Sequence, residues 1–518
     1  MAQDPSIWQH SRAYVLALAA FMGIFMFGYD TGLGGGLIVL PSFLRDFDML
    51  DLDDQALANR KGNVVSILQG GCLAGALLAA PLTNRIGRQK CLIVNCFAFL
   101  LGASIMTASP GNLGMFYGGR FTVGLGVGAM SMVCPTYVSE LSPKHIRGRI
   151  TGLFQVIVVI GVAASYWITY GVQHMKPTSA QWRIPVGFQL VPVGLMLCVL
   201  PFMKESPRWL ATNHRDELAL KNLAWIRKTS IDDPETRAEF NEIVASVAEE
   251  EAVTGGRTWK EAFLPGNRIR FFIAFAMFTF QQWSGQNSIN YYAPDIFKSI
   301  GIRGASTSLL ASGIYGIVKI VATAIFIFFG IERFGRRWSL TIGLGLMSLF
   351  LWIIGAIFNT HPPDKNAANP SGASIGMAAC IYLFVIPYCF SVGPVPWVYC
   401  AEIFNNRTRS YGLMTASATQ WLWNLIVSRF TPNIVLSLSH GGVFFFFASI
   451  NIFATIAAFF LPETRGLALE DMDVLFGFVD ADTHRADLAR AEAGRGMGKD
   501  EEFLDDEKAP ADTRIERI

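Results

Sequence analysis

Long apolar runs recur along almost the whole chain, and they constrain its fold more than any other feature. A helix needs about 20 mostly apolar residues to cross the hydrocarbon core of a bilayer. Such runs predict an all-α membrane protein with twelve transmembrane helices, six on each side of a polar insert. The predicted spans begin near Tyr14, Gly62, Cys91, Leu113, Ile150, Val186, Arg270, Ser306, Trp338, Ile375, Tyr411 and Gly442.

The composition agrees with a chain whose main solvent is lipid. Apolar residues make up 52% of the sequence and charged residues only 16%, whereas soluble domains carry about 25% charged residues. The formal net charge of +2 gives no reason to expect a nucleic-acid partner. Several of the eight cysteines lie inside apolar runs, and neither they nor the histidines show the spacing of a disulfide framework or metal site. We therefore expect no metal and no cofactor.

Basic residues in the short loops predict how the helices are oriented. Arg85, Arg88 and Lys90 lie between the second and third spans, and the other even-to-odd loops are also basic. Basic loops of this kind mark the cytoplasmic side, so both termini are expected in the cytoplasm. The first apolar run is too long for a signal peptide, and we interpret it as a retained span.

The spans and the insert divide the chain into five parts. The insert is charged, and residues 216–252 have the pattern of one or two amphipathic helices covering the cytoplasmic face. The end of the chain is charged and lacks apolar periodicity, which is typical of disorder. The predicted parts are a cytoplasmic N-terminus (1–13), an N-terminal six-helix bundle (14–203), a cytoplasmic helical loop (204–268), a C-terminal six-helix bundle (269–461) and a cytoplasmic, mostly disordered tail (462–518).

Short motifs recur in the two halves in the same order. Arg85 returns as Arg333, 248 positions later, and Glu140 returns as Glu402, 262 positions later. Because each half has six spans, both insert with the same orientation. This is the parallel repeat of a two-bundle transporter, in which the solute site lies between the bundles near mid-membrane.

The repeated charges have two interpretations. Arginine at a cytoplasmic helix end simply obeys the charge rule, but that rule does not explain the recurring carboxylates. We interpret the set as salt-bridge clamps made and broken as the bundles rock, and therefore as gating residues rather than solute ligands. The predicted network comprises Arg85, Arg88, Glu140, Arg147, Glu205, Glu332, Arg333, Arg336, Glu402, Arg409 and Glu463.

A series of signature motifs carries a family resemblance. They include Gly28-Tyr29-Asp30, Asn84-Arg85-Ile86-Gly87-Arg88, Gly119-Arg120, Glu205-Ser206-Pro207-Arg208, Gly393-Pro394-Val395-Pro396-Trp397 and Pro462-Glu463-Thr464-Arg465-Gly466. In this order they resemble the sugar porter family of the major facilitator superfamily (MFS), over nearly the whole chain. The resemblance is to fungal-type sugar/H⁺ symporters, sugar-acid or quinate permeases included. Asn84 stands where the family usually has aspartate, which puts the strength of the first clamp in doubt.

The resemblance implies the MFS fold and proton-coupled import of a monosaccharide or sugar-like acid by alternating access. Hexoses, pentoses, galacturonate and quinate are the candidate solutes. It also implies a cell-membrane location, a functional monomer, and outer-gate roles for Tyr291 and Tyr292. The partners are then the solute, the proton and the lipid bilayer. A facilitative uniporter is the alternative; a non-transporting nutrient sensor is disfavoured by the short tail, and an enzyme by the lack of a catalytic motif.

Asp30 and Arg120 are ionisable residues deep inside predicted spans, and such residues are rare and functional. Asp30 lies near the outer end of the first span, and Arg120 lies at a similar depth in the fourth. They can therefore form either a permanent structural ion pair or a proton switch. The resemblance favours the switch, because proton-coupled sugar porters carry these two residue types here.

Amide and aromatic side chains inside the spans fit the recognition of a hydroxylated ring. Amides both donate and accept hydrogen bonds, and aromatic faces stack on a sugar ring. A single buried amide more often joins two helices, but the resemblance implies solute contacts for the whole set. The set comprises Gln155, Gln281, Gln282, Asn287 and Asn424, with Trp397 and Trp421 as aromatic platform.

Lys319 departs from the family pattern near the middle of the eighth span, where many members have a neutral polar residue. It lies about 20 Å from either helix end, too deep to reach water easily. Because Asp30 already has Arg120, Lys319 is a surplus cation that a solute carboxylate would balance. Alternatively, it is a lysine of lowered pKa facing a wet cavity, or one that shares Asp30. Acidic and neutral solutes are equally compatible with the sequence.

Overall fold

The structure is a computed structural model that describes residues 11–254, 263–264, 267–302, 304–329, 335–364, 369–404, 408–438, 440–465 and 476. Within these ranges it leaves out the side chains of residues 11, 13, 144–152, 253–254, 328–329 and 410. The predicted tail beyond residue 465 therefore lies outside the described residues, apart from Phe476.

Helices are the only regular secondary structure in the described residues, which confirms the predicted all-α architecture. The first half of the chain forms α1 (Ser11–Leu37), α2 (Pro41–Asp46), α3 (Asp54–Ile86), α4 (Arg88–Ala108), α5 (Leu113–Leu141), α6 (Lys144–Gln173), α7 (Ala180–Phe188), α8 (Leu190–Val199) and a 3₁₀ turn (Leu200–Phe202). The polar insert forms α9 (Pro207–Thr212), α10 (Asp216–Arg227) and α11 (Pro234–Thr254).

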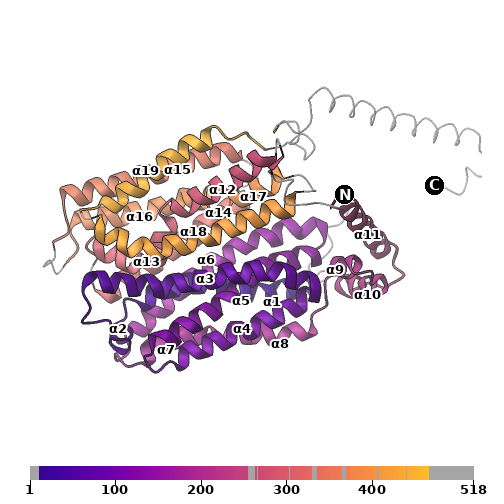
Figure 1. The fold of residues 1–518 in the computed structure, drawn as a ribbon, viewed down its shortest axis with the longest axis horizontal. Helices are drawn as coiled ribbons and strands as arrows, with labels where there is room; N and C mark the ends of the chain where they lie inside the picture. The colour runs from indigo at the N-terminus through magenta and orange to yellow at the C-terminus, as the bar shows by residue number, and fades with distance from the viewer. Residues whose placement is uncertain are drawn as a thin grey trace, which may run out of the picture.

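The second half of the chain repeats the pattern of long helices. It forms α12 (Asn267–Trp283), α13 (Gln286–Ser299), α14 (Ala305–Phe329), α15 (Arg336–Thr360), α16 (Gly372–Phe390), α17 (Val395–Ile403), α18 (Arg409–Ser437) and α19 (Gly442–Phe459). In Figure 1 the first half lies below the second, α9 to α11 lie at the right end, and α2 lies at the left end. We call these two ends of the molecule the α9–α11 end and the α2 end.

Ten stretches of helix among the described residues are long and apolar enough to cross a membrane. The two remaining expected spans correspond to α12 with α13, and to α18. The first is broken at Gly285, so neither piece reaches the required length. The second, α18, carries Asn424 and Arg429 among other polar groups, which lower its hydropathy. Polar content and breaks of this kind occur in membrane helices that line a cavity or contact other helices.

Glycines allow the long helices of the first half to approach closely. A side chain at Gly128 in α5 would lie 2.0 Å from the carbonyl oxygen of Cys72 in α3, and one at Gly71 would lie 2.2 Å from the carbonyl oxygen of Phe121. Small residues at helix contacts are the usual means of tight packing in lipid. The same packing holds α5 firmly beside α3, which positions Arg120.

The two halves meet along α3 with α18, α6 with α14 and α1 with α13. Polar contacts cross between the halves near the α2 end. Lys61 Nζ lies 2.9 Å from Asp295 Oδ2, and Arg429 donates to the side chain of Asn59 at 3.1 Å. Asn59 and Lys61 lie in the first turns of α3, so these contacts join the halves at the α2 end.

Candidate solute and proton site

Asp30 and Arg120 lie together in the core of the first half, as their depths predict. Asp30 comes from α1 and Arg120 from α5, and each is 1% exposed. Arg120 Nη1 lies 3.7 Å from Asp30 Oδ1, which is a charge contact longer than a hydrogen bond. Neither Asp30 oxygen has a hydrogen-bond partner among the described residues. The pair is therefore buried, attractive and incompletely satisfied.

Arg120 also holds a third helix. Its Nε donates to the carbonyl oxygen of Val64 in α3 at 3.0 Å. Gly34 makes room for the guanidinium, because a side chain there would lie 2.5 Å from Arg120 Nη2. The guanidinium thus connects α1, α3 and α5, and α3 in turn packs against α18 of the second half.

Lys319 is buried in α14, with 6% of its surface exposed. Its Nζ donates to Asn290 Oδ1 in α13 at 3.2 Å and lies 5.7 Å from the centre of the Tyr388 ring. Within the described part of the chain, Lys319 takes part in no ion pair. One predicted alternative was that Lys319 shares Asp30 with Arg120, but the structure shows no contact between Lys319 and Asp30.

The surroundings of Lys319 include residues that the sequence did not single out. Gln286 Nε2 donates to the hydroxyl of Tyr315 at 2.5 Å, and this pair joins α13 to α14 as Lys319 and Asn290 do. The Tyr166 hydroxyl, from α6 of the first half, donates to the carbonyl oxygen of Asn290. Gln286 lies four residues after Gln282, and Asn290 lies three residues after Asn287, so this helical spacing was a signal that could have found them.

The predicted amides of the seventh span surround its break at Gly285. Gly285 has a φ of +88°, a conformation that strongly favours glycine. The Asn287 side chain donates to Gln282 Oε1 across the break. Gln281 donates to the carbonyl oxygens of Val392 at 2.7 Å and Gly393 at 3.3 Å, where α16 gives way to α17. These amides therefore support the broken backbone of two spans.

The remaining predicted solute residues lie in different surroundings. Asn424 donates weakly to Gln69 of the first half at 3.4 Å, and Trp421 lies 5.5 Å from the ring of Phe27 across the same interface. Gln155 is half-buried in α6. Trp397 is 37% exposed and packs edge-on against Phe278 at 4.7 Å.

Several amide oxygens of α12, α13 and α18 are buried without a donor. Gln281 Oε1, Gln286 Oε1, Gln420 Oε1 and Asn424 Oδ1 have no hydrogen-bond partner among the described residues. A buried polar atom without a partner costs free energy. A solute with several hydroxyl groups can donate to such acceptors.

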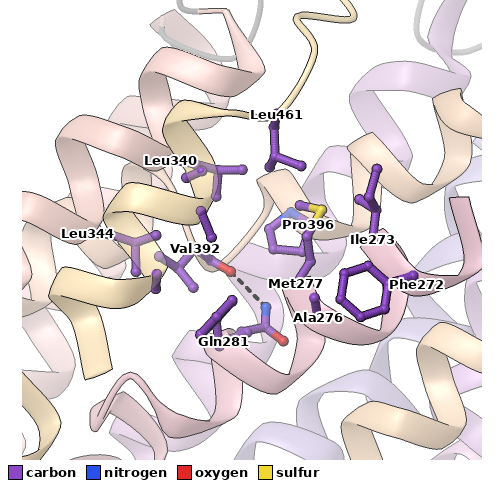
Figure 2. Close-up of a pocket in the computed structure, with 14 residues that line it drawn as sticks. Phe272, Ile273, Ala276, Met277, Gln281, Leu340, Leu344, Val392, Pro396 and Leu461 are labelled. Carbon is purple, nitrogen blue, oxygen red and sulfur yellow. Dashed lines mark hydrogen bonds between the residues drawn. The ribbon is translucent and has the colours of Figure 1, made fainter. Parts of the chain in front are cut away.

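An apolar pocket lies within the second half, between α12, α15, α17 and α19. Figure 2 shows Gln281 at its edge, donating to Val392, while Phe272, Met277, Leu340 and other apolar side chains form the rest of its wall. Of the predicted solute residues only Gln281 lines it. Because its wall is almost entirely apolar, this pocket is a poor match for a hydroxylated solute.

The predicted charge network forms a clamp near the α9–α11 end of the first half. Arg88 donates from Nε and Nη2 to the two oxygens of Glu140 at 3.0 and 2.8 Å. Glu205 accepts from the backbone N–H of Arg88 at 2.9 Å, and so caps the start of α4. Burial raises the pKa of the Glu205 carboxyl above its ordinary value, and backbone N–H groups of Ser206, Gln89 and Arg88 act in the opposite direction.

The second half repeats this clamp. Arg336 Nη2 donates to Glu402 at 2.8 Å, and Glu463 accepts from the backbone N–H of Arg336 at 2.8 Å. A side chain at Gly87 would lie 2.3 Å from Glu205 Oε2, and one at Gly335 would lie 2.4 Å from Glu463 Oε2. The recurring glycines therefore leave room for the capping carboxylates, which the charge rule alone does not explain.

The other described members of the predicted network take no part in these two clamps. Arg85 is exposed and makes no ion pair with a described residue. Arg409 donates to the carbonyl oxygen of Phe404 at 3.4 Å, while Glu402 takes Arg336. The residues Glu332 and Arg333 and the side chain of Arg147 lie outside what the structure describes. Both observed clamps join helices within one half and do not bridge the two halves.

The predicted outer-gate tyrosines lie in α13, where it packs against α1. A side chain at Gly35 of α1 would lie 2.0 Å from the carbonyl oxygen of Tyr291. The Tyr292 hydroxyl donates to the carbonyl oxygen of Ser428 at 2.6 Å, and the backbone of Tyr292 leaves the helical conformation. This close contact lies between the break at Gly285 and the contact of Lys61 with Asp295.

Comparison with known proteins shows the family and the fold. The family model described as "Sugar (and other) transporter" matches residues 15–476. The chain belongs to this transporter family. The prediction that it is a transporter rather than an enzyme is therefore confirmed, as is the predicted MFS sugar porter resemblance.

Curated relatives of this transporter cover almost its whole length. A quinate permease of Emericella nidulans is 39% identical over 475 residues, which are 90% of this chain and 88% of that relative. A probable quinate permease of Aspergillus terreus is 41% identical over 480 residues, 90% of this chain and 87% of that relative.

Solved structures share the fold of the transporter. The partially occluded, inward-open xylose transporter XylE from E. coli superposes with a TM-score of 0.73 at 26% identity, covering 88% of this chain and 100% of that one. The proton:xylose symporter XylE bound to 6-bromo-6-deoxy-D-glucose superposes with a TM-score of 0.72 at 27% identity, covering 90% and 99%. A multi-pass membrane protein with the MFS fold is confirmed by these matches.

Proposed function

We propose that this transporter imports a hydroxylated ring solute, a sugar or a sugar-like acid such as quinate, together with a proton. The observation that carries the proposal is the buried contact of Asp30 with Arg120. An aspartate inside a membrane helix is costly unless it has a role. Its oxygens lack hydrogen-bond partners among the described residues, which suits a carboxylate that gains and loses a proton.

The geometry supplies a way for the proton to act on the interface between the halves. Deprotonated Asp30 attracts Arg120, and protonated Asp30 loses that attraction. Arg120 is also bonded to the backbone of α3, and α3 packs on α18 in the other half. A change in charge at Asp30 therefore alters the packing at the surface along which the halves move.

The solute site in this proposal lies between the halves, around the break at Gly285. The candidate ligands are the predicted amides and Trp421, with Tyr291 and Tyr292 closing the site on its outer side. The unpartnered oxygens of Gln286 and Asn424 support this placement, because hydroxyl groups can satisfy them. Because each observed clamp lies within one half, we propose that the clamps hold that half together while the halves rock, in place of the predicted gating role in which they are made and broken.

The topology in the proposal follows the basic loops. The α9–α11 end is cytoplasmic, both termini lie in the cytoplasm, and the protein works as a monomer in the cell membrane. The α2 end is then the outer side, and the contacts of Lys61 with Asp295 and of Arg429 with Asn59 support an arrangement closed toward the outside.

Uptake by the purified protein in liposomes tests the proposal. Labelled quinate, galacturonate, glucose and xylose are supplied with and without an inward proton gradient. We expect at least one of these solutes to accumulate above its external concentration only when the gradient is present. Equilibration without accumulation would identify a facilitative uniporter, and binding without any uptake would identify a sensor.

A further inference from the structure

Lys319 is a buried cation that has no counter-charge among the described residues. Its Nζ donates to Asn290 Oδ1, and an ammonium group has three N–H donors, so two remain. The Tyr388 ring and the Cys389 side chain beside it carry no formal charge. Asp30 contacts Arg120, and Asp295 contacts Lys61, so the carboxylates of α1 and α13 already have cationic partners. A buried charge without a partner is costly, and an opposite charge lowers that cost.

Tyr315 provides a second donor on the same face of α14. It precedes Lys319 by four residues, which places the two side chains one above the other on a helix. The Tyr315 hydroxyl accepts from Gln286, and no described residue accepts its proton. A carboxylate has two oxygens, each of which can accept hydrogen bonds. Lys319 and Tyr315 therefore offer the charge and the donors that one carboxylate requires.

Lys319 and Tyr315 lie at the boundary between the two halves. Asn290, which holds Lys319 through its side chain, accepts a hydrogen bond from Tyr166 of the first half through its backbone carbonyl. Gln286, which holds Tyr315, has a buried oxygen with no donor among the described residues. The same small region thus combines a cation for a carboxylate with an acceptor for a hydroxyl group.

We propose that Lys319 and Tyr315 form a carboxylate subsite, so that the transported solute is a hydroxylated cyclic monocarboxylate rather than a neutral sugar. The proposal rests on the proposed function and names its substrate class. Lys319 pairs with the carboxylate, Tyr315 donates to it, and Asn290 and Gln286 position these two side chains. The hydroxyl groups of the ring face the unpartnered amide oxygens.

Matched pairs of solutes test the subsite directly. Quinate is compared with its methyl ester, and galacturonate with galactose, in liposomes that contain the purified protein. We expect the half-saturation concentration of at least one acid to be tenfold or more below that of its uncharged counterpart. In the Lys319→Asn variant this preference should disappear, whereas Lys319→Arg should retain part of it. Tyr315→Phe should weaken acid uptake less than Lys319→Asn does.

Asn290→Asp keeps the shape of the side chain and gives Lys319 an internal carboxylate. It should lower affinity for the acids without lowering affinity for their uncharged counterparts, and it serves even if Lys319→Asn fails to fold. Lys176→Gln, an exposed lysine of a loop at the α2 end, removes the same charge away from the subsite and should leave the preference unchanged.

Two results would overturn the subsite while leaving proton-coupled transport intact. One is proton-driven accumulation of glucose, xylose or galactose with no competition from either acid. The other is a Lys319→Asn variant in which the half-saturation concentrations of the acids and of their uncharged counterparts change by the same factor. Failure of the proposed function has a different signature, because no solute of the panel would then respond to the proton gradient.

Discussion

Our proposals for proton coupling and for solute choice rest on single buried charges. Asp30 and Arg120 contact one another at 3.7 Å, and Lys319 has amide and aromatic neighbours instead of an acid. The Asp30 oxygens lack hydrogen-bond donors, and Lys319 uses only one of its three N–H donors, among the described residues. Unsatisfied polar groups cost the most free energy inside a membrane protein. We attribute the Asp30 arrangement to the proton and the Lys319 arrangement to the solute.

The role of Asp30 is tested by Asp30→Asn, which resembles the protonated side chain permanently. We expect loss of proton-driven accumulation, with solute exchange across the membrane retained, because the step that needs deprotonation is absent. Accumulation is measured with an imposed gradient, and exchange is measured with solute on both sides. Accumulation at the level of the unmodified protein would show that the proton binds elsewhere.

The role of Gly87 is tested by Gly87→Ala. Its φ is +93°, and an added methyl group would lie 2.3 Å from Glu205 Oε2, so the cap of α4 must move. We expect the free energy of unfolding to fall by about 1 kcal/mol or more, measured as a lower unfolding temperature of the purified protein. Gly118→Ala is the control, because a side chain there would meet no atom within 4 Å.

At the scale of elements, two kinds of helix boundary organise the site. One is the break inside a span, at Gly285 in the seventh and between α16 and α17 in the tenth. The other is the capped start of α4 and of α15, where Glu205 and Glu463 accept from backbone N–H groups. Breaks free backbone groups for side chains such as Gln281, and caps fix where a helix begins.

The caps are tested by replacing the carboxylates. Glu205→Ala removes the acceptor for the first N–H groups of α4, and we expect a loss of about 0.5–2 kcal/mol in the free energy of unfolding. Glu205→Gln keeps one acceptor oxygen and should lose less. Asp232→Ala removes an acid from an exposed pair with Arg237 and should change the unfolding temperature little. Equal losses in all three variants would contradict the capping role.

At the scale of the whole molecule, the halves are two helix bundles that meet along three helix pairs. Each clamp lies within one half, whereas the contacts of Lys61 and Arg429 cross between the halves at the α2 end. In our proposal the halves rock as two units, as the bundles of such transporters do. The crossing contacts must therefore break before the α2 end can open.

A cross-link tests this motion and the orientation together. Lys61→Cys combined with Asp295→Cys places two thiols where the ion pair now closes the α2 end. We expect a short, membrane-impermeant thiol cross-linker added to intact cells to stop uptake. If the linker contains a disulfide, adding a reductant should cleave it and restore uptake. Each single variant is the control for modification of one thiol. Uptake that continues after complete cross-linking would contradict the opening of this end.

Much of the fold could be predicted from the sequence, because lipid imposes a length and an apolar composition on every span. The starts near Leu113 and Gly442 coincide with those of α5 and α19. The pairing of Asp30 with Arg120 also followed from depth alone. The partner of Glu140 did not, since Arg88 lies 52 residues away and competes with the nearer Arg147.

The sequence by itself determined the membrane fold, the repeat and the presence of a surplus cation at mid-membrane. Each depends on composition or on position along a helix, and so needs no knowledge of neighbours. Only the tertiary structure decided that Lys319 meets Asn290, that Tyr315 meets Gln286, and that the clamps stay within each half. The first two contacts depend on how the chain turns at Gly285 and on how α13 then packs on α14, and the clamps depend on how neighbouring helices of one half pack together.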